Sequence, residues 1–319
     1  MKAMQFLWMC VASLLFFCRA EAGDAVWEEQ ECPGGRGVEC IRAFPGVGIF
    51  AGTFGRGVFL SRDGGRIWEK AGRGLESPNV TGFALSGGGT LVAGTFGGGV
   101  CVWNPLASAW EPLSEGLEDD EVVAIASDPT GNLLAGTASG GMFRYDGVSA
   151  RWNLLGLRGE AINCIAARSP SEIFVGTRSS GVLVTRDGGS TWTAYGNALT
   201  GADVWALGIR GDGSLAAGTN GRGVYVSTDG GITWRCASTG LGSRNVGSLA
   251  LGSDGRMLAG TASGIYMMGP KGDTWRPVNG SAGVVPIRCL ACCPEGGLLA
   301  GTPGGALLRA ESGASLSLR

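Results

Sequence analysis

The chain has 319 residues, with 25 Lys and Arg against 27 Asp and Glu, and it contains no histidine. A net charge of −2 creates no basic surface field, so the composition argues against nucleic acid as a partner. The absence of histidine excludes Ser-His-Asp and Cys-His catalysis, histidine-ligated zinc and the usual proton shuttle at neutral pH. No motif predicts a metal or another cofactor.

The segment 1–22 is typical of a signal peptide. An apolar run covers positions 6–17, and Ala20-Glu21-Ala22 fits a cleavage site after Ala22. Cys18 leaves a lipoprotein signal as an alternative, although the bulky Phe17 before it is unusual for one. No later run reaches the roughly 20 apolar residues of a membrane-spanning helix. We therefore expect a secreted or periplasmic protein without a membrane span.

Glycine is very abundant, with 60 residues, and part of it marks an internal repeat. Seven Gly-Thr pairs follow one another at a nearly constant interval of about 42 residues, and repeats of this length indicate a propeller or a solenoid. The pairs are Gly52-Thr53, Gly94-Thr95, Gly136-Thr137, Gly176-Thr177, Gly218-Thr219, Gly260-Thr261 and Gly301-Thr302.

Tryptophan supplies a second marker in phase with the first. Six repeats contain a tryptophan after their Gly-Thr pair. In five of them it stands at the fifteenth position after the Thr, and in the sixth at the fourteenth. The tryptophans are Trp68, Trp110, Trp152, Trp192, Trp234 and Trp275. Each repeat reads as four short strands, for example a first strand at 122–126, a second at 133–137, a third such as 224–227 in another repeat, and a fourth that starts at the tryptophan. Four strands in about 42 residues match one propeller blade.

The seventh repeat lacks its tryptophan, and Trp27 stands where the missing fourth strand is needed. The step from Trp27 to Thr53 is nearly the same as the step from Trp68 to Thr95. Because an open ring would expose unpaired strand edges, the segment around Trp27 is expected to complete the last blade. This circular arrangement favours a propeller over a β-solenoid. The prediction is an all-β, seven-bladed β-propeller of four-stranded antiparallel blades, as one domain over residues 23–319 with a loose tail at 310–319.

Three repeats carry the fuller pattern Ser/Thr-x-Asp-x-Gly-x-x-Trp at 61–68, 185–192 and 227–234. This pattern resembles the Asp-box, or BNR, repeat of sialidase-like propellers, and the whole repeat is similar to ligand-binding sensor propellers of the broader WD40/YVTN-like type. The resemblance implies a turn between the third and fourth strands and a structural role for the Asp and Trp residues of the motif. These are Asp63, Trp68, Asp187, Trp192, Asp229 and Trp234.

Ligand binding is expected at one end of the ring, built from the loops between second and third strands and from the connections between blades, because loops on a rigid scaffold carry function. Arginines there could hold a carboxylate or sulfate, and aromatic side chains could stack on a ring or anchor a peptide. The candidates are Arg56, Arg178, Arg222, Phe54, Phe96, Asn220 and Trp205. Solubility for the arginines and blade packing for the aromatic residues remain open as alternatives.

The sequence favours a binding or scaffold module, acting as a monomer, that recognises a protein, peptide or glycan, with no catalytic residue assigned. The alternative is a polysaccharide-active glycoside hydrolase or lyase of the sialidase-like superfamily. Such an enzyme would need two facing carboxylates roughly 5–10 Å apart. Acids expected on the ligand face are Glu39, Asp119, Asp120, Glu121, Glu160 and Asp203.

Three of the cysteines occupy one repeat position. Cys40, Cys164 and Cys289 each stand at the thirteenth position before the Thr of their repeat, where other repeats have Gly, Ala or Ser. A slot for small residues predicts buried free thiols. Since export permits disulfides, a bridge across the ring closure is the alternative, either between Cys40 and Cys289 or from Cys32 to a neighbouring cysteine.

Overall fold

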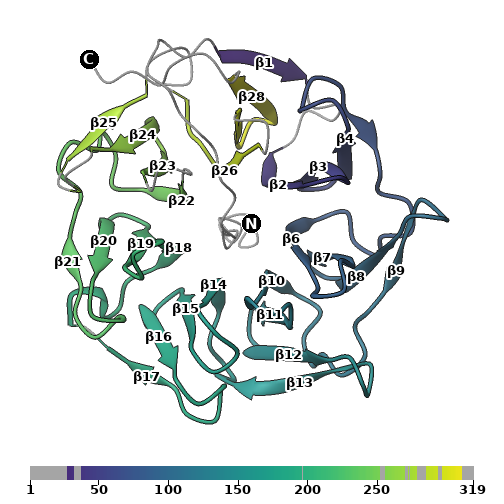
Figure 1. The fold of residues 1–319 in the computed structure, drawn as a ribbon, viewed down its shortest axis with the longest axis horizontal. Coiled ribbons are helices and arrows are strands. Elements are labelled where there is room, and N and C mark those ends of the chain that lie inside the picture. The colour runs from purple at the N-terminus through teal and green to yellow at the C-terminus, as the bar shows by residue number, and fades with distance from the viewer. Residues whose placement is uncertain are drawn as a thin grey trace, which may run out of the picture.

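The computed structural model describes residues 27–31, 37–195, 197–251, 256–269, 272, 274–278, 285–293 and 297–310. These residues form seven four-stranded antiparallel sheets, which surround a common centre as the blades of a ring (Figure 1). The predicted seven-bladed propeller is therefore confirmed. The predicted signal peptide lies outside the described residues, and the helical element found within them is too short to cross a membrane.

The blades follow one another in sequence order, and each runs from its first strand at the ring centre to its fourth strand at the outer edge (Figure 1). Blade A comprises β2 (Val38–Phe44), β3 (Gly48–Thr53), β4 (Gly57–Ser61) and β5 (Glu69–Lys70). Blade B comprises β6 (Val80–Leu85), β7 (Leu91–Thr95), β8 (Gly99–Asn104) and β9 (Ala109–Pro112). Blade C comprises β10 (Val122–Ser127), β11 (Leu133–Thr137), β12 (Met142–Asp146) and β13 (Arg151–Gly156).

The second half of the ring repeats this pattern. Blade D comprises β14 (Ile162–Ala167), β15 (Ile173–Thr177), β16 (Val182–Thr185) and β17 (Thr193–Ala194), and the short 3₁₀ helix η1 (Asn197–Leu199) follows it. Blade E comprises β18 (Val204–Ile209), β19 (Leu215–Thr219), β20 (Gly223–Ser227) and β21 (Arg235–Cys236). Blade F comprises β22 (Val246–Leu251), β23 (Met257–Thr261), β24 (Gly264–Met268) and β25 (Trp275–Pro277).

Blade G closes the ring with strands from both ends of the chain. It comprises β26 (Cys289–Cys292), β27 (Leu298–Gly301), β28 (Ala306–Ala310) and, as its outer strand, β1 (Trp27–Glu31). Trp27 pairs with Ala310 and is buried in the core between blades F and G. The predicted closure by the strand around Trp27 is confirmed. Ala310, which the sequence assigned to the loose tail, is the last residue of β28.

The glycine of each Gly-Thr pair is needed because the first strand of the next blade packs on its Cα. A methyl group at Gly218 would lie 2.8 Å from a methyl carbon of Val246, closer than atoms can approach without a shift. The contact recurs around the whole ring and crosses the closure, where Gly301 meets Val38. The threonine that follows uses its hydroxyl to close the next turn, as Thr219 does toward the Gly223 carbonyl at 2.7 Å.

We expect Gly218→Ala to destabilise the ring by about 1–3 kcal/mol, because the added methyl overpacks the contact between blades E and F. Urea unfolding of the purified chain measures the change. Gly147→Ala is the matched control, since no atom lies within 4 Å of its added methyl. An equal loss of stability in both variants would contradict the packing role of the signature glycine.

The cysteines at the repeated small-residue position are buried free thiols. Cys40 and Cys289 each point toward the next blade, and their sulfurs lie 3.8 and 3.6 Å from the carbonyl oxygens of Val80 and Val38. Burial raises the pKa of Cys40 and Cys164 well above the ordinary thiol value. The alternative of a bridge between Cys40 and Cys289 is therefore wrong for this structure, and Cys32 lies outside the described residues.

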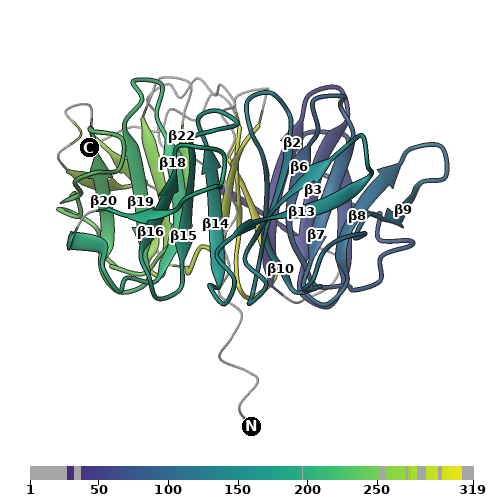
Figure 2. The ribbon, with the colours of Figure 1, turned by 90° about the horizontal axis from the view of Figure 1, so that it is seen from below.

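The ring has two rims, which lie at its opposite edges (Figure 2). Since Val38 pairs with Thr53, the starts of first strands share one rim with the turns between second and third strands. We call this the connector rim, because the segments linking consecutive blades also lie there. Phe44 pairs with Gly48 at the other end of the same strands. That edge, formed by the turns between first and second strands and the hairpins between third and fourth strands, is the hairpin rim.

Candidate functional site

The connector rim was expected to carry the ligand site. Most of the acidic residues expected on this face instead form hydrogen bonds that hold the rim together. Asp119 accepts hydrogen bonds from the Ser139 amide at 2.8 Å and the Gly140 amide at 2.9 Å, which fixes the turn of its own blade. Glu160 accepts from the Ser180 hydroxyl at 2.8 Å in the same way. Carboxylates engaged in such turns are poor candidates for acid–base catalysis.

Asp203 links two blades at this rim. Its two carboxylate oxygens accept hydrogen bonds from the amide of Asn163 at 2.8 Å and that of Asn220 at 3.1 Å. Asn163 belongs to blade D, whereas Asn220 belongs to the turn between β19 and β20 of blade E. Asn220, predicted as a ligand residue, is exposed but already engaged with Asp203.

A residue position that the sequence reasoning missed lies at the innermost strands. In six blades the pairing of first and second strands shifts by one residue, which leaves a bulged residue at the fourteenth position before the Thr of the repeat. The bulged residues are Glu39, Thr81, Val123, Asn163, Trp205 and Gly247, and Arg288 has the matching position before β26. β-Bulges re-aim side chains. The variety of residue types at this position is the feature of the sequence that could have marked it as a candidate site.

The polar bulged residues connect neighbouring blades. The Thr81 hydroxyl donates to the Val122 carbonyl of the next blade at 2.9 Å. Across the ring closure, the Arg288 Nε donates to Glu39 Oε2 at 2.7 Å, and both side chains are largely buried. Burial raises the pKa of Glu39, and the Arg288 guanidinium opposes that rise. These side chains act as links between first strands.

The predicted aromatic ligand residues are at least partly covered. Trp205 is 6% exposed and packs in the core cluster around blade E. Phe96 is half-buried and packs against the core between blades C and D. Phe54 is half-buried too, and its backbone amide donates to the Gly37 carbonyl at 3.1 Å. Blade packing, the alternative for these residues, accounts for the observed contacts of Trp205 and Phe96.

The three predicted arginines do not converge. Arg178 and Arg222 are exposed on adjacent blades D and E, whereas Arg56 is exposed on blade A, three blades away around the ring (Figure 1). Arg222 is held in place, since its terminal nitrogens donate to the carbonyls of Thr200 and Gly201 at 3.0 and 3.1 Å. Arg244, in the connector after blade E, is exposed as well.

Charge is distributed unevenly around the connector rim. We call the rim of blades D and E, with Arg178, Arg222 and Arg244, the basic sector. Its described carboxylates, Glu160 and Asp203, are both engaged by hydrogen-bond donors. The connector between blades B and C instead carries an acidic run with two ion-paired neighbours. The run and its neighbours are Glu115, Glu118, Asp119, Asp120, Glu121, Arg151 and Arg158.

Glu121 is the carboxylate of the acidic run that most resembles a general acid. Burial raises its pKa, and the neighbouring charges of Asp119 and Asp120 add to that rise. A glycosidase would pair it with a second free carboxylate. Asp119, however, has a lowered pKa despite burial, because backbone amides and the Ser139 hydroxyl hydrogen bond to it. The two carboxylates therefore do not form an available catalytic pair.

The three hairpins with the Ser/Thr-x-Asp-x-Gly-x-x-Trp pattern lie on the hairpin rim, away from the basic sector. In one of them, Asp229 accepts hydrogen bonds from the Ser227 hydroxyl at 2.8 Å and the Thr233 amide at 2.9 Å. The Thr233 hydroxyl also donates to Asp229, and these bonds lower the pKa of Asp229 to about 2. The corresponding bonds from the Thr191 side chain and amide lower the pKa of Asp187 to about 2.

The tryptophans of the three hairpins differ in their partners. The indole nitrogens of Trp68 and Trp234 donate to the carbonyls of Gly65 and Gly231 in their own hairpins, at 3.1 and 3.0 Å. Trp192 is only half-buried and donates to the Leu155 carbonyl of the preceding blade at 2.9 Å. Each of the three therefore secures blade structure.

Comparisons with known proteins support the architecture. No protein-family model and no curated protein matches the chain. The extracellular domain of a hybrid two-component system from B. thetaiotaomicron superposes with a TM-score of 0.72 at 17% identity, over 89% of this chain and 41% of that chain. The WD40 repeats of RRP9 superpose with a TM-score of 0.72 at 15% identity, over 92% of this chain and 99% of that chain. At these identities the likeness shows the fold alone.

Proposed function

We propose that the chain is an exported, monomeric ligand-binding propeller without catalytic activity. Its ligand is an anionic peptide, protein segment or glycan, and its binding surface is the basic sector of the connector rim. The observation that carries this proposal is the pair of exposed guanidinium groups on adjacent turns, Arg178 and Arg222, beside carboxylates that are already hydrogen bonded. Guanidinium groups bind carboxylates and sulfates through paired hydrogen bonds.

The uneven charge of the rim supports this choice of ligand. The acidic run lies in the connector before blade C and the basic sector on blades D and E, and physiological salt screens exposed charges over about 8 Å, which weakens the effect of one on the other. An anion that approaches the rim is directed toward the basic sector. Arg222 is also positioned in advance by the Thr200 and Gly201 carbonyls, which reduces the entropy lost on binding.

We also propose that the chain is an Asp-box propeller and that it is exported. The hydrogen bonds within the Asp hairpins, such as Ser61 to Asp63 at 2.8 Å, support assignment to the Asp-box propellers. The signal-like sequence of residues 1–22 supports export, and the likeness to an extracellular sensor domain is in keeping with it. N-terminal sequencing of the secreted protein would test cleavage after Ala22.

Arrays of acidic and neutral peptides and glycans test the proposed surface. We expect the double variant Arg178→Gln/Arg222→Gln to lose about tenfold or more in affinity for an acidic hit, because two charge-assisted contacts disappear. The matched control is Arg56→Gln, which removes an exposed arginine from a corresponding turn on blade A. Binding that survives in the double variant, or falls equally in the control, would overturn the assignment to the basic sector.

A further inference from the structure

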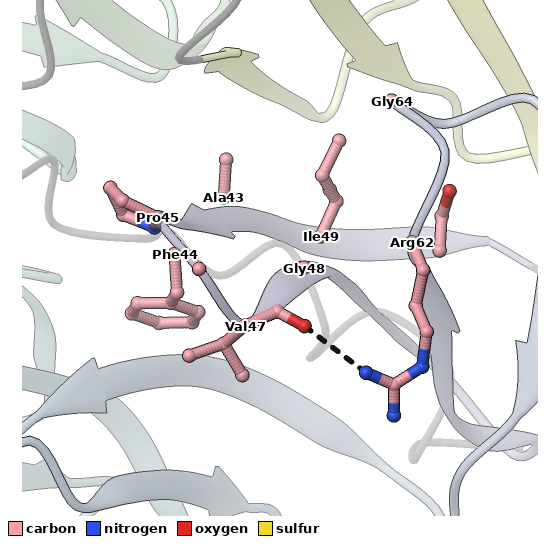
Figure 3. Close-up of a pocket in the computed structure, with 10 residues that line it drawn as sticks. Ala43, Phe44, Pro45, Val47, Gly48, Ile49, Arg62 and Gly64 are labelled. Carbon is pink, nitrogen blue, oxygen red and sulfur yellow. Dashed lines mark hydrogen bonds between the residues drawn. The ribbon is translucent and has the colours of Figure 1, made fainter.

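A separate cavity opens on the hairpin rim of blade A. Its volume is about 400 Å³, within the range of sites that hold small molecules or single side chains. It lies beside the turn between β2 and β3 and the start of the hairpin after β4 (Figure 3). The residues that define its chemistry are Ala43, Phe44, Pro45, Val47, Ile49 and Arg62.

The narrow turn of blade A explains why a cavity forms at this blade. Three residues, 45–47, connect β2 to β3, whereas five residues connect the corresponding strands in blades B, C, D and E. Gly46, with a φ of 75°, makes the tight reversal possible. A narrow turn leaves the flank of the neighbouring hairpin uncovered.

The cavity is lined by backbone and polar groups together with several apolar side chains. Ala43 and Ile49 are buried toward the core between blades G and A, whereas Phe44 is buried toward the core between blades A and B (Figure 3). Val47, at the tip of the turn, is 38% exposed and adds an aliphatic surface at the mouth. An occupant at the mouth of the cavity therefore meets one exposed aliphatic side chain, that of Val47.

Arg62 supplies a cation at the edge of the cavity. Its Nη1 lies 3.5 Å from the Val47 carbonyl oxygen, which is a long contact (Figure 3). Within the described part of the chain, no carboxylate forms an ion pair with Arg62. The adjacent Asp63 is committed to its own turn, where it accepts from the Ser61 hydroxyl and the Ile67 amide.

Blade D shows what this arginine position binds when a carboxylate is present. Arg186 precedes Asp187 as Arg62 precedes Asp63, so the two arginines are equivalent in the repeat. Arg186 forms an ion pair with Glu172, which lies in the turn between β14 and β15. The turn of blade A is shorter and offers the aliphatic Val47 with no carboxylate of its own.

We propose that the blade A cavity binds an aliphatic carboxylate from outside the chain. Its carboxylate contacts Arg62 as the Glu172 carboxylate contacts Arg186, and its apolar body lies against the exposed side chain of Val47. This chemistry is shared by the C-terminal residue of a peptide and by a free branched-chain acid. The site is on the rim opposite to the basic sector, so it does not depend on the proposed function.

Calorimetric titration of the full chain with three probes tests the site. The probes are acetyl-Gly-Gly-Gly-Leu with a free carboxylate, the same peptide as its C-terminal amide, and free 4-methylpentanoate. We expect the two carboxylates to bind with a Kd of about 1 mM or lower and the amide about tenfold more weakly. Tighter binding of the peptide acid identifies a peptide C-terminus as the source, and equal binding of both acids identifies the free acid.

Three variants show whether Arg62 is responsible. Arg62→Gln should lower the affinity for the carboxylate probes about tenfold, whereas Arg186→Gln, at the equivalent position of blade D, should leave it unchanged. Val47→Glu places a carboxylate of the chain itself near Arg62 and should compete with the probes to a similar extent. Melting curves confirm that each variant is folded. The proposal is overturned if no carboxylate probe binds up to about 10 mM, if acid and amide bind equally, or if Arg62→Gln and Arg186→Gln behave alike.

Discussion

A chain shortened to begin at residue 32, and so deprived of β1, is expected to lose most of its stability and to aggregate. Trp27 packs in the core between blades F and G, and removal of a buried tryptophan side chain alone costs about 3–5 kcal/mol. Whole domains are stable by only about 5–15 kcal/mol. The loss of β1 also leaves the edge of β28 without its partner, which promotes pairing between molecules.

Thermal melting and light scattering measure the loss of stability and the aggregation. Addition of the missing strand as a separate peptide tests whether the loss is due to β1 itself. A synthetic peptide that covers residues 23–36 should raise the melting temperature of the shortened chain, because it can add as a strand to β28. A scrambled peptide of the same composition is the control. If the shortened chain melts like the parent, closure of blade G by β1 is not required for the fold.

Glu39→Gln is expected to destabilise the ring by about 3–5 kcal/mol, because it leaves the Arg288 guanidinium buried beside a neutral group. For a chain of this size that loss lowers the melting temperature by about 10 °C. The double variant Glu39→Gln/Arg288→Gln should regain much of the loss. The bulged positions of other blades support this expectation, since Val123 and Trp205 occupy them without any charge.

The exposed ion pair between Arg158 and Glu118 provides the control for this prediction. Its Nη2–Oε1 distance is 2.7 Å, yet both side chains are largely open to solvent. Exposed pairs of this kind contribute little, so Glu118→Gln should leave the melting curve unchanged. A Glu39→Gln protein that melts like the Glu118→Gln protein would show that the closure does not depend on the buried pair.

The sequence was sufficient to predict the architecture because the repeat depends on steric needs that only certain residues meet. Gly218 must lack a side chain where Val246 packs on it, and the tryptophans must fill the outer blade core. Such requirements leave the same residue at the same interval in every blade. The position of the Trp27 strand followed from the same interval.

The candidate site was harder to predict for two physical reasons. The interval between repeats gives the blade of a residue but says nothing of its distance from a residue on another blade. Arg56 was therefore grouped with Arg178, although their blades are far apart around the ring. The bulged position, moreover, has no required residue type, since Glu39 and Gly247 both occupy it. A search for recurring residues passes over such a position.

The composition of blade G has a consequence for the order of events during synthesis. Because β1 is synthesised before the other described strands and pairs with β28, the last of them, the ring can close only after all seven blades have been synthesised. The antiparallel hairpins of blades A to F involve near neighbours in sequence and can form as they appear. The nascent chain therefore remains an open arc, with the outer edge of blade G unformed, until β28 has been synthesised.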